Sequence, residues 1–392
     1  MDSPATPAVS ASLPREAVAR PAIESWPAFL MAIGATFIAV GIMWDISWHE
    51  TIGRDAFWTP AHVCIYLGGV IGGSVGGWLA VKYTFLTPAG QPIPGVSVFG
   101  ARAPLGAWVA IWGAVAMLTS APFDNWWHNA YGLDVKIISP PHTVLGLGML
   151  GISLGALLLV LSRQNREGDG TGAGLFVYMG GIFMLLGGVF VTEYSWPNLQ
   201  HAAIFYKVAA LTFPFRLVTI GRAGKISWAA TRCAAVFMLG ACLMTWILPL
   251  FPAHPKLAPI FNPITHMTPP PFPLLLIVPA VGIDLLLRRV GEVPAWKGVA
   301  TALALGAIFL VVLGAAQWFF SIFLLSPGAN NWFFAGDRIW SYGASPGDYR
   351  HEFWRLDEDP LNAIGLVWAL IYATASAWVG LRFGDWMRKA VR

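Results

Sequence analysis

Apolar residues fill most of this chain in long runs, and the segments between the runs hold most of the charged residues, prolines and histidines. Each run contains about 20 residues, which is the length of α-helix that crosses ~30 Å of hydrocarbon. The pattern therefore predicts about ten transmembrane helices. Their expected bounds are 26–46, 60–84, 103–123, 140–162, 174–194, 201–220, 229–251, 271–288, 298–325 and 360–382.

The composition indicates the same class of protein. Of the 392 residues, 56% are hydrophobic and only 11% are charged, whereas a soluble domain carries roughly 25% charged residues. So few charges cannot cover a surface that faces water. The expected fold class is all-α, a polytopic transmembrane helix bundle surrounded by the lipid bilayer.

The chain divides into three regions. Residues 1–25 are rich in alanine, proline and serine and show no cleavable signal peptide, so we expect a disordered cytoplasmic tail. Residues 26–225 are expected to form a membrane domain that carries the motifs described below. Residues 226–392 add further transmembrane helices and a long outer loop, 326–359, whose length suits a lid or a docking surface.

Basic residues gather at alternate ends of the predicted helices. The positive-inside rule therefore places both termini in the cytoplasm, and we expect the inner (plasma) membrane of a bacterium. The net charge of +4 does not indicate nucleic-acid binding, because the basic residues form no stripe. All of the histidines then fall on the outer side, at positions 49, 62, 128, 142, 201, 254, 266 and 351.

A short motif occurs twice at the outer side, each time between two successive predicted helices. The shared frame is D-x-x-W-H-x-x-x-G-x-D followed by [ST]-P-x-H, with one extra proline in the second copy. The first copy runs from Asp45 to His62 and the second from Asp124 to His142. This repetition predicts a duplicated helical hairpin, with the two copies running parallel.

The spacing within the first copy predicts a metal site. Asp45 and His49 are four residues apart, so they share one face of a helix. Thr59 is an expected N-cap with Pro60 at the first helical position, which places His62 in the first turn of the returning helix. The hairpin can therefore present one carboxylate and two imidazoles to a single metal ion.

The second copy repeats this arrangement with Asp124, His128 and His142. Asp55 in the first copy and Asp134 in the second are expected to accept hydrogen bonds from the distal ring N–H of a ligand histidine. Titratable groups at membrane depth are costly and are functional candidates by default.

At these residues the chain resembles the C subunit of the copper membrane monooxygenases, the particulate methane and ammonia monooxygenases, over about residues 30–165. In that family an Asp, a His four residues on and a His thirteen further form one copper site, which falls here on Asp45, His49 and His62. The neighbouring family site has an Asn, a His four on and a His fourteen further. That spacing falls on Asp124, His128 and His142, with Asp124 in place of the Asn.

The resemblance implies one or two copper ions and a monooxygenase, or a subunit of one, that activates O2 to oxidise a small apolar substrate. It also implies A- and B-type partner subunits, with self-association as a homo-oligomer as the other arrangement. Electrons would come from a quinol or a periplasmic donor. No catalytic residue beyond the metal ligands is assigned.

Other interpretations stay open from the residues alone. A non-catalytic membrane protein can hold, deliver or transport copper through two sites in series, although Asp284 is one of few polar residues inside the predicted spans. Two histidines and one carboxylate also suit non-haem iron. Zinc is a third metal, with Glu50 as the nearest general base.

Further polar residues flank the motifs. Glu193 and His201 are expected either to flank the metal sites or to mark an interfacial helix end. Asn262 and His266 repeat the four-residue spacing, and Lys207 is expected to extend its charge toward the membrane surface. The glycine-rich run 68–77 predicts close helix packing rather than a phosphate loop.

Overall fold

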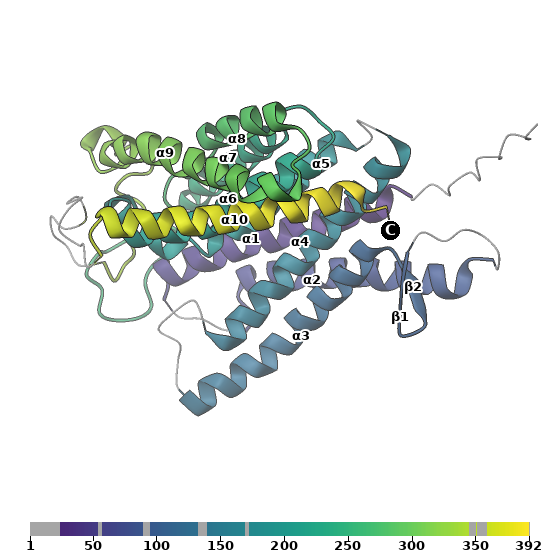
Figure 1. Cartoon of the computed structure of the whole chain (residues 1–392). Coiled ribbons are helices and arrows are strands. Elements are labelled where there is room, and N and C mark those ends of the chain that lie inside the picture. The colour runs from purple at the N-terminus through teal and green to yellow at the C-terminus, as the bar shows by residue number, and fades with distance from the viewer. Residues whose placement is uncertain are drawn as a thin grey trace, which may run out of the picture.

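The computed structural model describes residues 24–53, 57–88, 95–131, 139–168, 172–344, 350 and 359–391. The fold in this part of the chain is mostly helical (Figure 1). The α-helices are α1 Trp26–Thr51, α2 Pro60–Val81, α3 Leu105–Tyr131, α4 Pro140–Glu167, α5 Ala173–Val189, α6 Ala203–Ala223, α7 Ala229–Ile247, α8 Ile277–Val290, α9 Gly298–Leu324 and α10 Ala363–Lys389. A short antiparallel hairpin, β1 Val96–Val98 and β2 Ala101–Ala103, precedes α3.

Eight helices in the described part of the chain are long and apolar enough to cross a membrane, which fits a multi-pass membrane protein. The remaining two of the ten expected spans are shorter. The span expected at 174–194 is α5, which ends at Val189 and gives way to short 3-10 turns. The span expected at 271–288 is helical only from Ile277, because the prolines at 269–271 and 273 lack the N–H that a helix needs.

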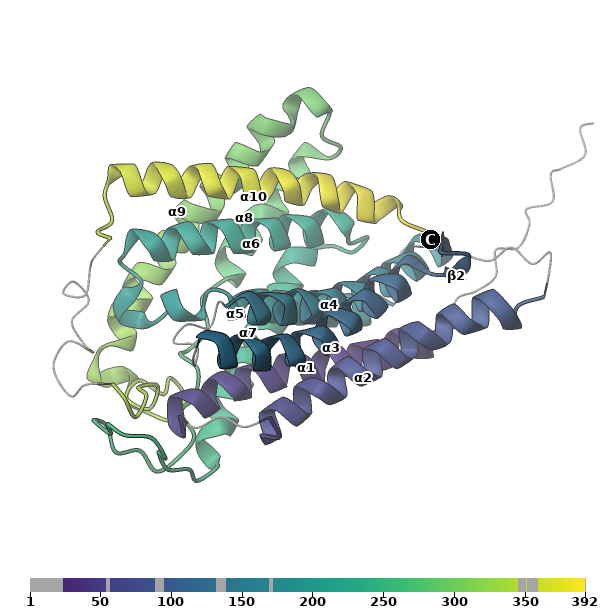
Figure 2. The ribbon, with the colours of Figure 1, turned by 90° about the horizontal axis from the view of Figure 1, so that it is seen from below.

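The helices pack as neighbouring hairpins. Helix α1 lies along α2 and α3 along α4, and α2 also packs against α3 and α1 against α4. In the second half of the chain α10 runs beside α6 and α9, as Figure 2 shows, while α5 and α8 pack on α7. The two motif-bearing hairpins are therefore adjacent in space as well as in sequence.

The glycine-rich run on α2 packs closely, as predicted. A Cβ atom on Gly68 would lie 2.5 Å from the backbone oxygen of Gly34 on α1. A Cβ on Gly76 would lie 2.9 Å from the backbone oxygen of Ala107 on α3. The small residues let the backbones approach, which is how helices associate where the hydrophobic effect is weak. Gly77, by contrast, faces open space.

We predict that Gly68→Ala destabilises the protein, because the added methyl group meets backbone atoms of α1 that cannot move aside without separating the helices. Overpacking of this kind costs about 1–3 kcal/mol. Thermal unfolding in detergent, followed by circular dichroism, measures the effect. Gly77→Ala on the same helix is the matched control and should leave the unfolding temperature unchanged or slightly raised. Equal behaviour of the two variants contradicts the packing account.

One end of the bundle, here called the terminal end, gathers the residues next to both chain termini. Asn165 near the end of α4 donates hydrogen bonds to the carbonyls of Met387 and Ala390 in α10. Arg222 of α6 pairs with Asp385 of α10. The opposite end, which carries both motifs, is called the site end.

Two polar residues inside helices have structural partners. Asp284 of α8 accepts hydrogen bonds from the backbone N–H groups of Ala230 and Thr231 and thereby caps the first turn of α7 from a neighbouring helix. Lys207, near the start of α6, pairs with Asp359 at 2.9 Å, and the Asp359 side chain is 41% exposed. The ion pair gives the ammonium group a partner at this end of the helix.

Candidate metal centre

The first hairpin folds at the site end as its capping residues predict. Thr59 has an extended backbone, and its hydroxyl accepts a hydrogen bond from the backbone N–H of His62 at 3.2 Å. Pro60 is the first residue of α2. The cap therefore sets the start of α2 and puts the imidazole of His62 in its first turn. Gly53, at the end of α1, has a φ of +76°, a backbone conformation that glycine adopts without strain.

Asp45, His49 and His62 come together between α1 and α2. The Nε2 atom of His62 lies 3.1 Å from Oδ1 of Asp45, and Nε2 of His49 lies 3.9 Å from Oδ2 of the same carboxylate. The side chain of Asp45 is 14% exposed and that of His62 is 18% exposed, whereas His49 is 48% exposed. One carboxylate thus stands between two imidazoles, and the more exposed imidazole lies farther from it.

The Asp45 carboxylate is incompletely satisfied. Its Oδ1 atom is buried and accepts no hydrogen bond of acceptable geometry from the residues that the structure describes, although His62 is close. A buried anionic oxygen without a hydrogen bond is costly. A cation bound between Asp45 and His62 would remove that cost, so the charge of this pair is compatible with a bound cation.

The second hairpin has the same local structure. Ser139 caps α4 by accepting a hydrogen bond from the backbone N–H of His142 at 3.3 Å, and Pro140 is the first helical residue. Nε2 of His142 lies 3.5 Å from Oδ1 of Asp124 on α3. The backbone of His128 belongs to α3, but its side chain lies outside the described residues.

The hydrogen bonds expected at Asp55 and Asp134 are not tested, because both residues lie outside the described residues. Within the described ranges, no group of three or more histidine, cysteine, aspartate or glutamate side chains is arranged so that it could hold a metal ion. Asp45 and His62 are in contact, and Nε2 of His49 lies 3.9 Å from the Asp45 carboxylate.

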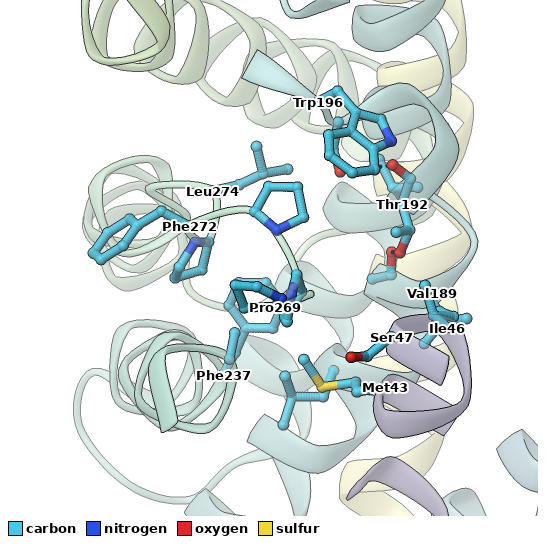
Figure 3. Close-up of a pocket in the computed structure, with 18 of the residues that line it drawn as sticks. Met43, Ile46, Ser47, Val189, Thr192, Trp196, Phe237, Pro269, Phe272 and Leu274 are labelled. Atoms are coloured by element: carbon cyan, nitrogen blue, oxygen red, sulfur yellow. Dashed lines mark hydrogen bonds between the residues drawn. The ribbon is translucent and has the colours of Figure 1, made fainter. Parts of the chain in front are cut away.

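Glu50 lies on a different face of α1 from the ligand residues. It is five residues from Asp45, which places the two about 140° apart around the helix. Glu50 lines a cavity of about 80 Å³, and Ser341 donates a hydrogen bond to its carboxylate. Figure 3 shows this cavity, with Met43 and Ser47 of α1 facing Phe237 and Pro269.

Glu193 and His201 are also at the site end, but the contacts described for them do not include Asp45, His49 or His62. Glu193 lies in the 3-10 turn Thr192–Tyr194 and acts electrostatically on Glu50 as a like charge. His201 is buried next to Gln200, whose amide oxygen accepts a hydrogen bond from Gln317 of α9. Glu193 is therefore associated with the α1 face that Glu50 occupies. His201 lies next to a residue, Gln200, that is hydrogen-bonded to α9.

Asn262 and His266 do not share a helix face, because the segment 251–276 is not helical. Asn262 donates hydrogen bonds to the carbonyls of Trp340 and Ser341. Burial, and to a lesser degree the charge of Arg338, lowers the pKa of His266 below its ordinary value. The four-residue spacing therefore has no helical meaning at these two residues.

Sequence reasoning missed a groove of about 360 Å³ beside the first hairpin. Trp44 and Trp48 line it from α1, and the segment 251–256 with Met267 lines it from the other side. The two sides are about two hundred residues apart in the chain, so no local pattern signals the groove.

Comparison of the chain with known protein families, curated proteins and solved structures finds no match.

We predict that Thr59→Ala loosens the start of α2 and lowers the unfolding free energy by about 0.5–2 kcal/mol, the usual cost of losing an N-cap. Thr59→Ser keeps the hydroxyl and is the matched control. Chemical denaturation of the detergent-solubilised protein measures the difference. If Thr59→Ala and Thr59→Ser unfold alike, the hydroxyl does not position His62.

Proposed function

We propose that this chain is a copper-binding integral membrane protein of the monooxygenase C-subunit type, with its first site at Asp45, His49 and His62. The observation that carries the proposal is the buried, unsatisfied Oδ1 atom of Asp45 beside His62, at residues whose spacing matches a copper site of that family. The position of His49 on the same carboxylate supplies the third donor.

The donor set supports a transition metal. Two neutral imidazoles and one carboxylate suit copper, iron and zinc, and affinity for copper exceeds that for the other two at most such sites. With three protein ligands, a coordination position stays open for water or O2. The resemblance to the copper monooxygenases selects copper among these metals.

The proposal includes a duplicated hairpin and a second site. Thr59 and Ser139 cap their helices in the same way, and in both hairpins the returning histidine approaches the aspartate of the preceding helix. The second site would consist of Asp124, His128 and His142. Asp124 replaces an amide by a carboxylate, which adds a negative charge and favours the more highly charged oxidation state of a bound metal.

Copper in the first site would supply redox chemistry for O2 activation, with electrons from a quinol or a periplasmic donor. The protein's own part is to hold the ion and to exclude water. Asp45 supplies the neutralising charge, and Trp44 and Trp48 line a separate apolar groove on the same helix end, which suits a small apolar substrate. Partner A- and B-type subunits, and an outer location of both sites, belong to the same proposal.

The decisive experiment is metal analysis of the purified protein by mass spectrometry, with EPR of the oxidised sample. We expect copper in the wild type and its loss from the double variant His49→Ala/His128→Ala, because each hairpin loses an imidazole ligand. His266→Ala removes a histidine from the same end outside the motifs and should leave the copper content unchanged. Equal metal content in wild type and double variant would refute the metal site.

A second measurement separates catalysis from carriage. Copper-loaded protein, supplied with a reductant and a small alkane, should consume O2 and form the alcohol, and His49→Ala should abolish both. Copper movement into vesicles that contain the protein, with no oxidation, favours a copper carrier instead. Iron in place of copper in the metal analysis favours the non-haem iron alternative.

A further inference from the structure

Two basic side chains from different helices meet at the terminal end, where α9 begins beside the C-terminal part of α10. Lys297 directly precedes α9, and Arg382 belongs to α10. A Cβ atom on Gly298 would contact the guanidinium group of Arg382 and would lie 3.7 Å from Nε1 of Trp378. Arg382 and Trp378 of α10 therefore lie against the residue that follows Lys297.

Each of the two cations lies over a tryptophan ring. Nζ of Lys297 is 4.7 Å from the ring centroid of Trp296, and the guanidinium carbon of Arg382 is 5.9 Å from that of Trp378. Both tryptophans are exposed at the surface of the bundle. Tryptophan is enriched at the level of lipid headgroups, because its ring is apolar and its N–H is polar. We call Trp296, Lys297, Trp378 and Arg382 the α9–α10 patch.

The charge of this patch is not cancelled by the carboxylates nearest to it in the sequence. Asp385, one turn after Arg382 on α10, is paired with Arg222 of α6. Glu292 is the acidic residue of the connection between α8 and α9, and it is exposed. Within the described part of the chain, neither Glu292 nor Lys297 takes part in an ion pair. The patch therefore has a net positive charge, which attracts anions.

Exposed apolar residues continue from the patch along both helices. Val299 and Leu303 of α9 and Val379 of α10 are exposed, and both helices are long and apolar enough to cross a membrane. A small soluble anion would use the cations alone. A ligand with an anionic head and hydrocarbon chains matches the cations and the apolar surface together.

We propose that the α9–α10 patch binds the headgroup of an anionic phospholipid, whose acyl chains lie along the exposed faces of α9 and α10. The guanidinium group of Arg382 donates hydrogen bonds to the phosphate, and Lys297 adds a second positive charge. Basic pockets between transmembrane helices recognise anionic headgroups in this way. The site lies at the opposite end of the bundle from the motifs and needs no metal ion.

The test is native mass spectrometry of the full chain in detergent, titrated with phosphatidylglycerol and, in parallel, with phosphatidylcholine. We expect the wild type to prefer phosphatidylglycerol. Lys297→Gln/Arg382→Gln should lower the affinity for this lipid by about tenfold or more, because it removes two charges that attract the headgroup. Lys297→Arg/Arg382→Lys keeps both charges and should retain the preference.

Lys225→Gln/Arg232→Gln is the matched control. It removes the same charge from the connection between α6 and α7 and from the start of α7, at the same end of the bundle, and should bind phosphatidylglycerol like the wild type. Equal affinities of the two glutamine variants overturn the proposal, because the lipid would then respond to net charge and not to the patch.

A readout on the wild type does not depend on how a variant folds. The protein is placed in phosphatidylcholine vesicles with a photoactivatable phosphatidylglycerol, and the labelled peptides are identified. Labelling at 296–303 and 378–386 that unlabelled phosphatidylglycerol suppresses supports the site, whereas labelling spread evenly over the apolar helices overturns it. Suppression by inorganic phosphate also overturns it, because the patch would then bind a small anion rather than a lipid.

Discussion

The close approach of α1 and α2 is the contact on which the candidate metal centre depends. Gly34 and Gly68 allow the two backbones to come within a distance that any side chain would prevent. In a bilayer, where apolar side chains gain little by leaving lipid, such close packing is a main source of helix association. It also determines how far Asp45 on one helix lies from His62 on the next.

Several charged groups elsewhere in the helical part of the chain have protein partners. Asp284 caps α7, Lys207 pairs with Asp359, and Arg222 pairs with Asp385. Lipid offers no hydrogen bonds, so each of these partners offsets a large desolvation cost. Buried side-chain atoms of Ser153 and Gln164 lack a hydrogen bond from the described residues, as Oδ1 of Asp45 does. The Asp45 oxygen differs from them in its negative charge, and that charge beside two imidazoles supports the proposed cation.

The faces of α1 at the site end have different surroundings. Asp45 and His49 face α2, whereas Met43, Ser47 and Glu50 face a cavity bounded by the proline-rich segment before α8. Trp44 and Trp48 border a third space, the groove against the segment 251–256. The end of α1 therefore borders three different surroundings, which are helix α2, a small cavity and a groove.

The sequence by itself determined the helical class, most helix positions and the local structure of both hairpins. Long apolar runs, N-caps such as Thr59 and Ser139, and the turn glycine Gly53 act over a few residues, so their effects can be read from the chain directly. Only the tertiary structure decided where α8 begins, which partner Asp284 and Lys207 find, and that Arg382 of α10 lies beside the start of α9. Those outcomes depend on how distant helices pack, and helix packing is a property of contacts between segments that no local pattern contains.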